Sequence, residues 1–239
     1  MDTFNQFSIS ISGNLIRCPD LLIKKSKLLE QMCFFGENTS EFIELPEFIT
    51  KEAISDIVKL VKSLDFESLL TFDVPNLLVL FETSDFLDVD ELTNSLMNII
   101  IDKISSENCF EVFKMSRTSA CFTKITIASL EVISELLRPY YVNLPRSEGY
   151  EDPYYETYKL LTCTEMKCII SFMQSSLTVC KISLFQNWLK ANKNISLEEA
   201  TDILTMINVE ACYIPRIEIK YMRQIRDSIL TELNSRINL

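Results

Sequence analysis

Two different hydrophobic periods follow one another between residues 42 and 113, and this succession constrains the fold more than any other feature of the sequence. Before Leu45 and Pro46, apolar and polar residues alternate, which is typical of a short strand. An apolar stripe at helical spacing follows, and Thr50 can cap its N-terminus. The stripe consists of Ile54, Ile57, Val58, Val61 and Leu64. The sequence therefore predicts a strand that leads directly into a helix.

Two more helices are predicted in the same stretch. Asp73 can cap the first, Pro75 suits its first turn, and its pattern ends near Asp85. The second begins at residues 89–91, and its apolar positions are Leu92, Leu96, Ile99, Ile100 and Ile104. Strand, helix and paired helices together favour an α+β fold.

The first 35 residues add a hairpin and two helices to this unit. Phe7, Ile9 and Ile11 alternate with serines, Gly13 and Asn14 supply turn chemistry, and residues 15–18 return as a second strand. Residues 20–25 fit a short helix. Ser26 can then cap a second helix, which carries Leu28, Leu29, Met32 and Phe35.

This order resembles the BTB/POZ interaction fold. The resemblance is carried by the sequences IELP at 43–46, LL at 77–78 ahead of SDFLDVDEL at 84–92, and SENCF at 106–110. In BTB domains a strand, a hairpin strand, a short helix, a serine and a helix lead into the third strand. The resemblance implies a BTB/POZ-like domain at residues 1–104, in which a small sheet is covered by helices.

Two features depart from that family. Many dimeric members begin with a long amphipathic helix, whereas about six residues precede Phe7 here. The domain is therefore expected to lack this helix and to be a monomer or an atypical dimer. The histidine that commonly follows the second strand is replaced by Cys18.

The remainder of the chain is predicted to be all-helical. Two helices are expected before residue 138, and the proline-rich segment 138–153 is predicted to be an irregular loop. Thr164 is expected to cap a helix that contains Met166 and Ile170, and Ser196 to open a capping box with Glu199.

Residues 176–189 resemble the signature of the BACK domain, the helical partner of many BTB domains. In that signature Leu-x-Val precedes a helix that ends in Phe-x-x-Trp, here Phe185 and Trp188. Lys181 stands where the family usually carries glutamate. The resemblance implies a BACK-like domain at residues 105–239, without kelch repeats.

Composition excludes several classes of function. The chain has no histidine, three glycines and no C-x-x-C pair among its eight cysteines, so the common catalytic, cofactor and zinc arrangements are missing. A formal charge of −11 disfavours nucleic acid as a partner. No apolar run approaches the ~20 residues that span a bilayer. We expect a non-enzymatic intracellular protein of the cytoplasm or nucleus, with free thiols, no cofactor and no membrane contact.

Two groups of residues are candidates for contacts with a partner protein. Phe35, Gly36 and Glu37 match the hydrophobic-x-Glu triplet with which BTB adaptors contact cullin-3; alternatively, Phe35 packs inward and Glu37 begins a solvated loop. The further cullin-contact candidates implied by the resemblance are Ser84, Asp85, Asp88, Asn108 and Phe110. Tyrosines suit interfaces, and the candidates in and beside the 138–153 loop are Tyr140, Tyr141, Tyr150 and Tyr154.

The resemblance implies a protein–protein interaction adaptor, a substrate adaptor or accessory subunit of a cullin-3 ubiquitin ligase. One alternative is a scaffold without a ligase link that binds through its C-terminal helices or the tyrosine-rich loop. The other is a shortened regulator that occupies a partner without delivering a substrate to it.

Overall fold

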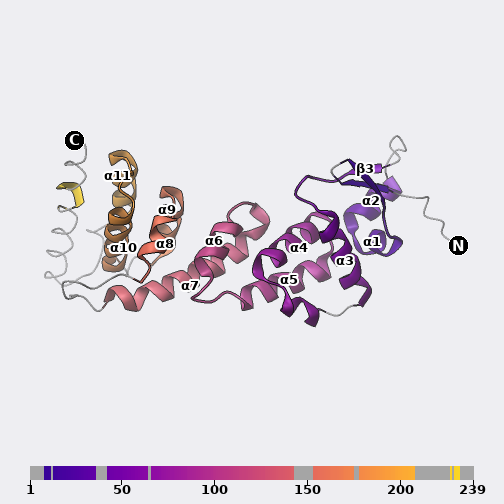
Figure 1. Cartoon of the computed structure of the whole chain (residues 1–239), viewed down its shortest axis with the longest axis horizontal. Coiled ribbons are helices and arrows are strands. Elements are labelled where there is room, and N and C mark those ends of the chain that lie inside the picture. The colour runs from indigo at the N-terminus through magenta and orange to yellow at the C-terminus, as the bar shows by residue number, and fades with distance from the viewer. Residues whose placement is uncertain are drawn as a thin grey trace. The chain divides into compact units, whose positions relative to one another are not determined.

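The computed structural model of the chain describes residues 8–11, 13–35, 42–63, 66–142, 153–174, 178–207, 227 and 229–231. Figure 1 labels its helices and strands in chain order. The chain divides into two compact units, the first of residues 1–105 and 111–128 and the second of residues 106–110 and 129–239. Helices α6 (Cys109–Ser116) and α7 (Thr123–Val142) therefore contribute residues to both units.

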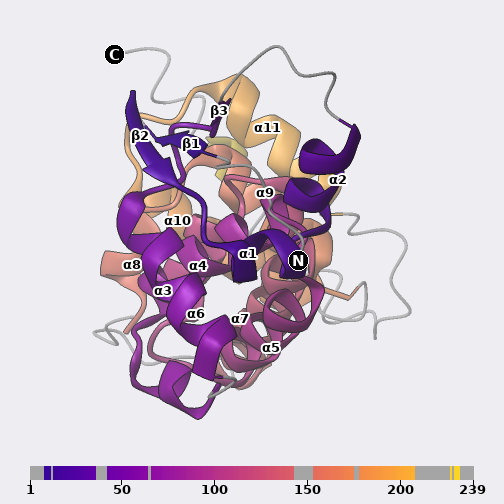
Figure 2. The ribbon, with the colours of Figure 1, turned by 90° about the vertical axis from the view of Figure 1, so that its right-hand side faces the viewer.

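A small three-stranded sheet begins the first unit (Figure 2). Strands β1 (Ser8–Ile11) and β2 (Asn14–Arg17) form the predicted antiparallel hairpin. Gly13 lies in its turn with φ of 78°, a conformation that glycine adopts without steric cost. Strand β3 (Phe42–Glu44) pairs in parallel with β1, so the strand order is β2-β1-β3 and β1 is central.

Helices make up most of the first unit. They are α1 (Asp20–Lys25), α2 (Lys27–Phe35), α3 (Lys51–Ser63), α4 (Val74–Phe86) and α5 (Asp90–Asp102), with the short 3-10 helices η1 (Glu67–Thr71) and η2 (Ala120–Phe122). Helix α4 packs against α3 and α5, and α1 packs against α2 and α3. The predicted α+β class is confirmed, since a small sheet accompanies a mainly helical chain.

The predicted caps of α3 and α4 are confirmed. The Ala53 N–H donates to Thr50 Oγ1 at 3.1 Å, and the Asn76 N–H donates to Asp73 Oδ1 at 2.9 Å. Both bonds satisfy donors that the first turn of a helix leaves open.

The core of the first unit is apolar and draws on the sheet and on every helix from α1 to α5. Its fully buried side chains include Ile9, Leu29, Ile49, Ile57, Leu69, Leu77, Leu87, Leu96 and Ile100. Cys18 is also buried, and burial raises the pKa of its thiol to about 12. The thiol therefore stays protonated and packs as an apolar group.

The second unit contains α8 (Tyr155–Lys159), α9 (Cys163–Phe172), α10 (Thr178–Ala191) and α11 (Leu197–Met206). Helix α10 packs on α8 and α11, and α9 packs on α11. Trp188 is fully buried on α10, where its ring stacks on Phe185 at 5.9 Å. Its Nε1–H donates to the Leu161 carbonyl at 3.0 Å, so the indole joins the start of α9 to α10.

Two predictions for the second half need correction. Helix α9 is capped by Thr162 rather than Thr164, because Glu165 lies three residues after Thr162 and completes a capping box. Helix α7 continues through Pro139 to Val142, so residues 138–142 of the predicted loop are helical. A proline removes one backbone donor and does not always end a helix. Residues 143–152 lie outside the described residues.

The capping box of α11, with Ser196 and Glu199, is confirmed. Among the described helices, none has both the length and the apolarity to cross a bilayer.

Candidate docking surface

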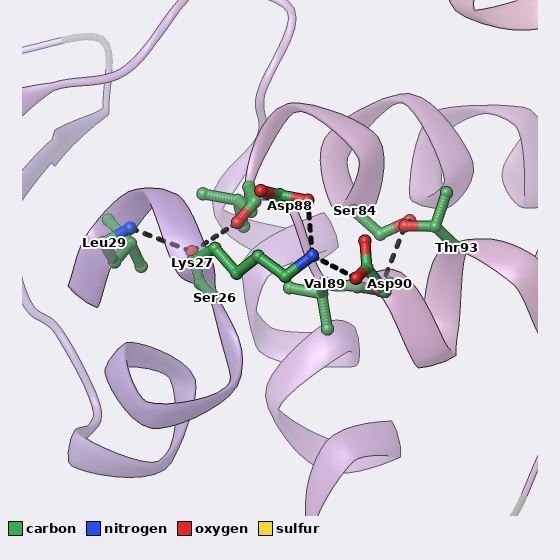
Figure 3. A network of polar contacts seen from close by, with 9 residues as sticks. Ser26, Lys27, Leu29, Ser84, Asp88, Val89, Asp90 and Thr93 are labelled. Carbon is green, nitrogen blue, oxygen red and sulfur yellow. Dashed lines mark hydrogen bonds and ion pairs between the residues drawn. The ribbon is translucent and has the colours of Figure 1, made fainter. Parts of the chain in front are cut away.

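The start of α2 and the end of α4 satisfy each other's open backbone groups (Figure 3). Ser26 is buried, accepts the Leu29 N–H at 3.1 Å and donates its own hydroxyl to the Leu87 carbonyl. The Lys27 N–H donates to the Asp88 carbonyl at 3.2 Å. Helix ends normally leave such donors and acceptors unpaired. The bond from the Leu29 N–H caps α2, and the two bonds to the carbonyls of Leu87 and Asp88 fix the α4–α5 turn on α2.

The turn after α4 has the geometry of a Schellman motif. The Val89 N–H donates to the Ser84 carbonyl and the Asp88 N–H to the Asp85 carbonyl, both at 3.0 Å. Asp88 has φ of 55°, the left-handed conformation that glycine usually supplies and aspartate tolerates better than most residues. Val89 is buried and anchors the turn in the core, whereas the carboxylate of Asp85 is exposed to solvent.

A set of ion pairs surrounds this turn. The Lys27 ammonium lies 3.8 Å from Asp88 and contacts Asp90, and the Lys25 ammonium lies 3.6 Å from Glu91. The hydrogen bond from Lys27 lowers the pKa of Asp90, and the same bond raises the pKa of Lys27. All these groups are solvent-accessible, so their contribution to stability is small and their main effect is to order the side chains.

Ser84, a predicted contact residue, is fully buried. Its hydroxyl donates to the Phe81 carbonyl at 2.9 Å and accepts from Thr93 Oγ1 at 3.0 Å. Thr93 lies on α5, so Ser84 joins α4 to α5. We therefore correct its role from partner contact to internal hydrogen bonding.

Two exposed aromatic rings meet beside the turn. Phe48, between β3 and α3, is 43% exposed, and Phe86, the last residue of α4, is 37% exposed. Their ring centroids lie 5.8 Å apart at an interplanar angle of 86°, an edge-to-face contact. Val79 is also exposed and lies two turns before Phe86 on the same face of α4. The rings of Phe48 and Phe86 therefore expose apolar area to solvent beside the α4–α5 turn.

Acidic groups adjoin this aromatic pair in the sequence. Asp85 precedes Phe86, and Asp88 follows it by two residues. Partial desolvation, together with the nearby Asp88 carboxylate, raises the pKa of Asp85. A cation from a partner would relieve that repulsion. We call Phe48, Asp85, Phe86 and Asp88 the aromatic–acidic surface.

Asp85 and Asp88 are among the contact candidates that the BTB resemblance implies, whereas Phe48 and Phe86 are not. The missing signal is non-local, because the two rings are 38 positions apart and only the fold brings them together.

The second unit brings two separately predicted residues together. Phe110, a cullin-contact candidate, and Tyr154, a loop candidate, are both half-buried, with ring centroids 6.2 Å apart. Tyr154 also lies against the buried Tyr158 at 6.4 Å. These contacts form a packed aromatic cluster at the start of α8. Asn108 is half-buried near the start of α6.

The other candidates lie wholly or partly outside the described residues. Phe35 ends α2, and Tyr140 and Tyr141 belong to the last turns of α7, but their side chains are outside the described part. Glu37 and Tyr150 are outside it entirely.

This arrangement presents exposed rings, carboxylates and a rigid turn, which are groups that another protein can contact. Within the described residues, no three cysteine or carboxylate side chains gather closely enough to hold a metal ion. No family model matches the chain, and no curated protein matches its sequence.

Proposed function

We propose that this chain is a protein–protein interaction adaptor of the BTB type with a BACK-like second half, acting as a substrate adaptor or accessory subunit of a cullin-3 ubiquitin ligase. The BTB-like part spans residues 1–104 and the BACK-like part spans 105–239. The aromatic–acidic surface is the observation that carries the proposal, since exposed paired rings beside carboxylates are typical of a docking site.

Three features of the fold support the proposal. The order β1, β2, α1, Ser26, α2 and β3 is the order that the BTB resemblance implies. Ser26, the serine that the resemblance implies before α2, is buried, and its hydroxyl both donates and accepts a hydrogen bond. In the second unit, Trp188 of the BACK-like signature is the buried centre of a helix pair.

Docking would place an apolar partner segment over Phe48 and Phe86, with a basic partner side chain near Asp85. Burying two half-exposed rings provides the affinity, because large aromatic groups dominate interface energies. Partial burial raises the pKa of Asp85, and repulsion from Asp88 raises it further; a partner cation would offset the second of these effects. Phe35 and Glu37 are proposed to contact the same partner.

Calorimetric titration of the full chain with the N-terminal region of cullin-3 tests the proposal. Binding is expected at tens of micromolar or tighter, and Phe48→Ala with Phe86→Ala should weaken it by at least about tenfold, since each ring acts as an anchor. Leu70→Ala is the matched control, because Leu70 is a 58% exposed apolar residue of the same unit outside the surface. Absence of binding at these concentrations refutes the ligase link.

A scaffold without a ligase link is the second candidate, favoured by exposed apolar residues on the second unit. Leu160 is 66% exposed and Tyr155 is 37% exposed, both beside the aromatic cluster of Phe110 and Tyr154. For this scaffold, Tyr155→Ala with Leu160→Ala should abolish proximity labelling of its partners, whereas Phe48→Ala with Phe86→Ala should leave the labelling unchanged. For the adaptor, Phe48→Ala with Phe86→Ala should abolish the labelling, whereas Tyr155→Ala with Leu160→Ala should leave it unchanged.

A further inference from the structure

A small pocket opens in the first unit between the start of α2, the end of α3 and the α4–α5 turn. Its volume is about 190 Å³, below the ~300–1,000 Å³ of typical small-molecule sites. The volume suits one aliphatic side chain rather than a cofactor. The lining residues are Lys25, Lys27, Val61, Phe66, Asp88, Val89, Asp90, Glu91 and Leu92.

The floor and the rim of this pocket differ in chemistry. Val61, Val89 and Leu92 are buried and Phe66 is half-buried, which gives an apolar floor. All five charged lining residues are exposed or half-exposed and form the rim. An apolar floor beneath a charged rim is the arrangement in which a protein interface seats an anchor side chain.

The rim carries one more carboxylate than ammonium groups. Three acidic and two basic residues line it, and Lys27 alone serves both Asp88 and Asp90. The Glu91 side chain is the most exposed of the three, at 62%, and its distance to Lys25 is 3.6 Å. A basic group from outside can therefore pair with Glu91 without displacing the two contacts of Lys27.

The pocket is also ordered before any partner arrives. The bonds of Ser26 to Leu29 and Leu87 and of Lys27 to Asp88 fix the backbone on two sides of it (Figure 3). A pre-organised pocket loses little entropy when a side chain enters.

We propose that this pocket binds a segment of a partner protein in which an aliphatic side chain is flanked by arginine or lysine. The aliphatic group rests on Val61, Val89 and Leu92, and the basic neighbour pairs with Glu91. The inference goes beyond the cullin-3 proposal and does not depend on it. Of the aromatic–acidic surface only Asp88 also lines the pocket, and the contacts proposed here use Val61, Val89, Leu92 and Glu91 instead.

Titration of the full chain with the tripeptide acetyl-Arg-Leu-Arg-amide, followed by methyl NMR, tests this inference. Shifts should be largest at the methyl groups of Val61, Val89 and Leu92, with a Kd on the order of 1 mM for so small a ligand. Acetyl-Arg-Ala-Arg-amide should bind about tenfold more weakly, because it lacks most of the buried apolar area.

Charge reversal supplies the matched variants. Glu91→Lys should weaken the Arg-Leu-Arg peptide about three- to tenfold and should favour acetyl-Glu-Leu-Glu-amide instead. Glu52→Lys is the control, since both glutamates are exposed in the first turn of a helix and Glu52 does not line the pocket. It should bind both peptides as the unaltered chain does.

Three results overturn the inference. One is no methyl shift at about 10 mM peptide, roughly tenfold above the expected Kd. Another is equal binding by the Glu91→Lys and Glu52→Lys variants. The third is the same set of shifts on concentrating the protein alone, which identifies a second copy of the chain as the occupant. Loss of cullin-3 binding by itself leaves the inference standing.

Discussion

Replacing Ser26 with alanine should destabilise the first unit far more than removing an ordinary helix cap. The hydroxyl accepts the Leu29 N–H and donates to the Leu87 carbonyl, 61 positions away, and it is buried. Loss of the cap costs about 1 kcal/mol. The buried carbonyl left without this donor costs about 1–3 kcal/mol more. The expected decrease in the free energy of unfolding is therefore about 2–4 kcal/mol.

Thr50→Ala provides the comparison. Thr50 caps α3 through one bond to the Ala53 N–H, and it is exposed. Only the cap is lost there, so the cost should be about 1 kcal/mol. The difference between the two variants isolates the second bond of Ser26, and it should amount to about 1–3 kcal/mol.

Hydrogen exchange read by mass spectrometry on peptides from α2 and α4 measures the effect in the first unit. Trp188 lies in the second unit, so the urea midpoint of its fluorescence should shift much less in either variant. If Ser26→Ala and Thr50→Ala accelerate exchange equally, the bond to Leu87 contributes nothing and the account of how α2 holds the α4–α5 turn is wrong.

Three further outcomes follow from named contacts. Asp88→Ala should be less stable than Asp88→Gly by about 1 kcal/mol in the free energy of unfolding measured with urea, since both variants lose the carboxylate and only alanine is strained at φ of 55°. Equal urea midpoints would contradict this. The raised pKa of Asp85 means that ionisation costs stability above that pKa, so Asp85→Asn should stabilise the chain at pH 7. The gain should shrink as the pH falls through the raised pKa and vanish below the unfolded value near 3.8; a gain independent of pH would exclude the mechanism. Trp188→Phe should cost about 2–4 kcal/mol in thermal unfolding followed by circular dichroism, because it deprives the Leu161 carbonyl of its donor and leaves a cavity. An unchanged melting temperature would show that the indole bond is dispensable.

Local chemistry made much of the fold predictable. Thr50, Asp73, Ser26 and Ser196 mark helix starts, because a capping side chain bonds to backbone groups within three residues of itself. The same logic failed at Thr164, where a second threonine two residues earlier has the glutamate at the right spacing. Pro139 predicts a helix boundary, yet a helix can continue past a proline at the cost of one bond.

The candidate surface was less predictable than the helices. Asp85 and Asp88 are candidates through the BTB resemblance, whereas the contact of Phe48 with Phe86 depends on how the segment after β3 lies beside the end of α4. Ser84 lies in the same segment as Asp85 and Asp88 but is buried, because a helix turns every third or fourth residue away from solvent. Residue type alone does not distinguish these two orientations.

Two long-range contacts affect how the chain folds while it is synthesised: the pairing of the central strand β1 with β3, and the bond of Ser26 to Leu87. A two-stranded hairpin is marginally stable by itself, so β1 and β2 wait for residues 42–44 to emerge. The first turn of α2 completes its hydrogen bonds later still, when residue 87 has left the ribosomal exit tunnel. A nascent chain that stalls before that point exposes the edge of β1 and the apolar residues of α1 and α2, and it is then a substrate for chaperones.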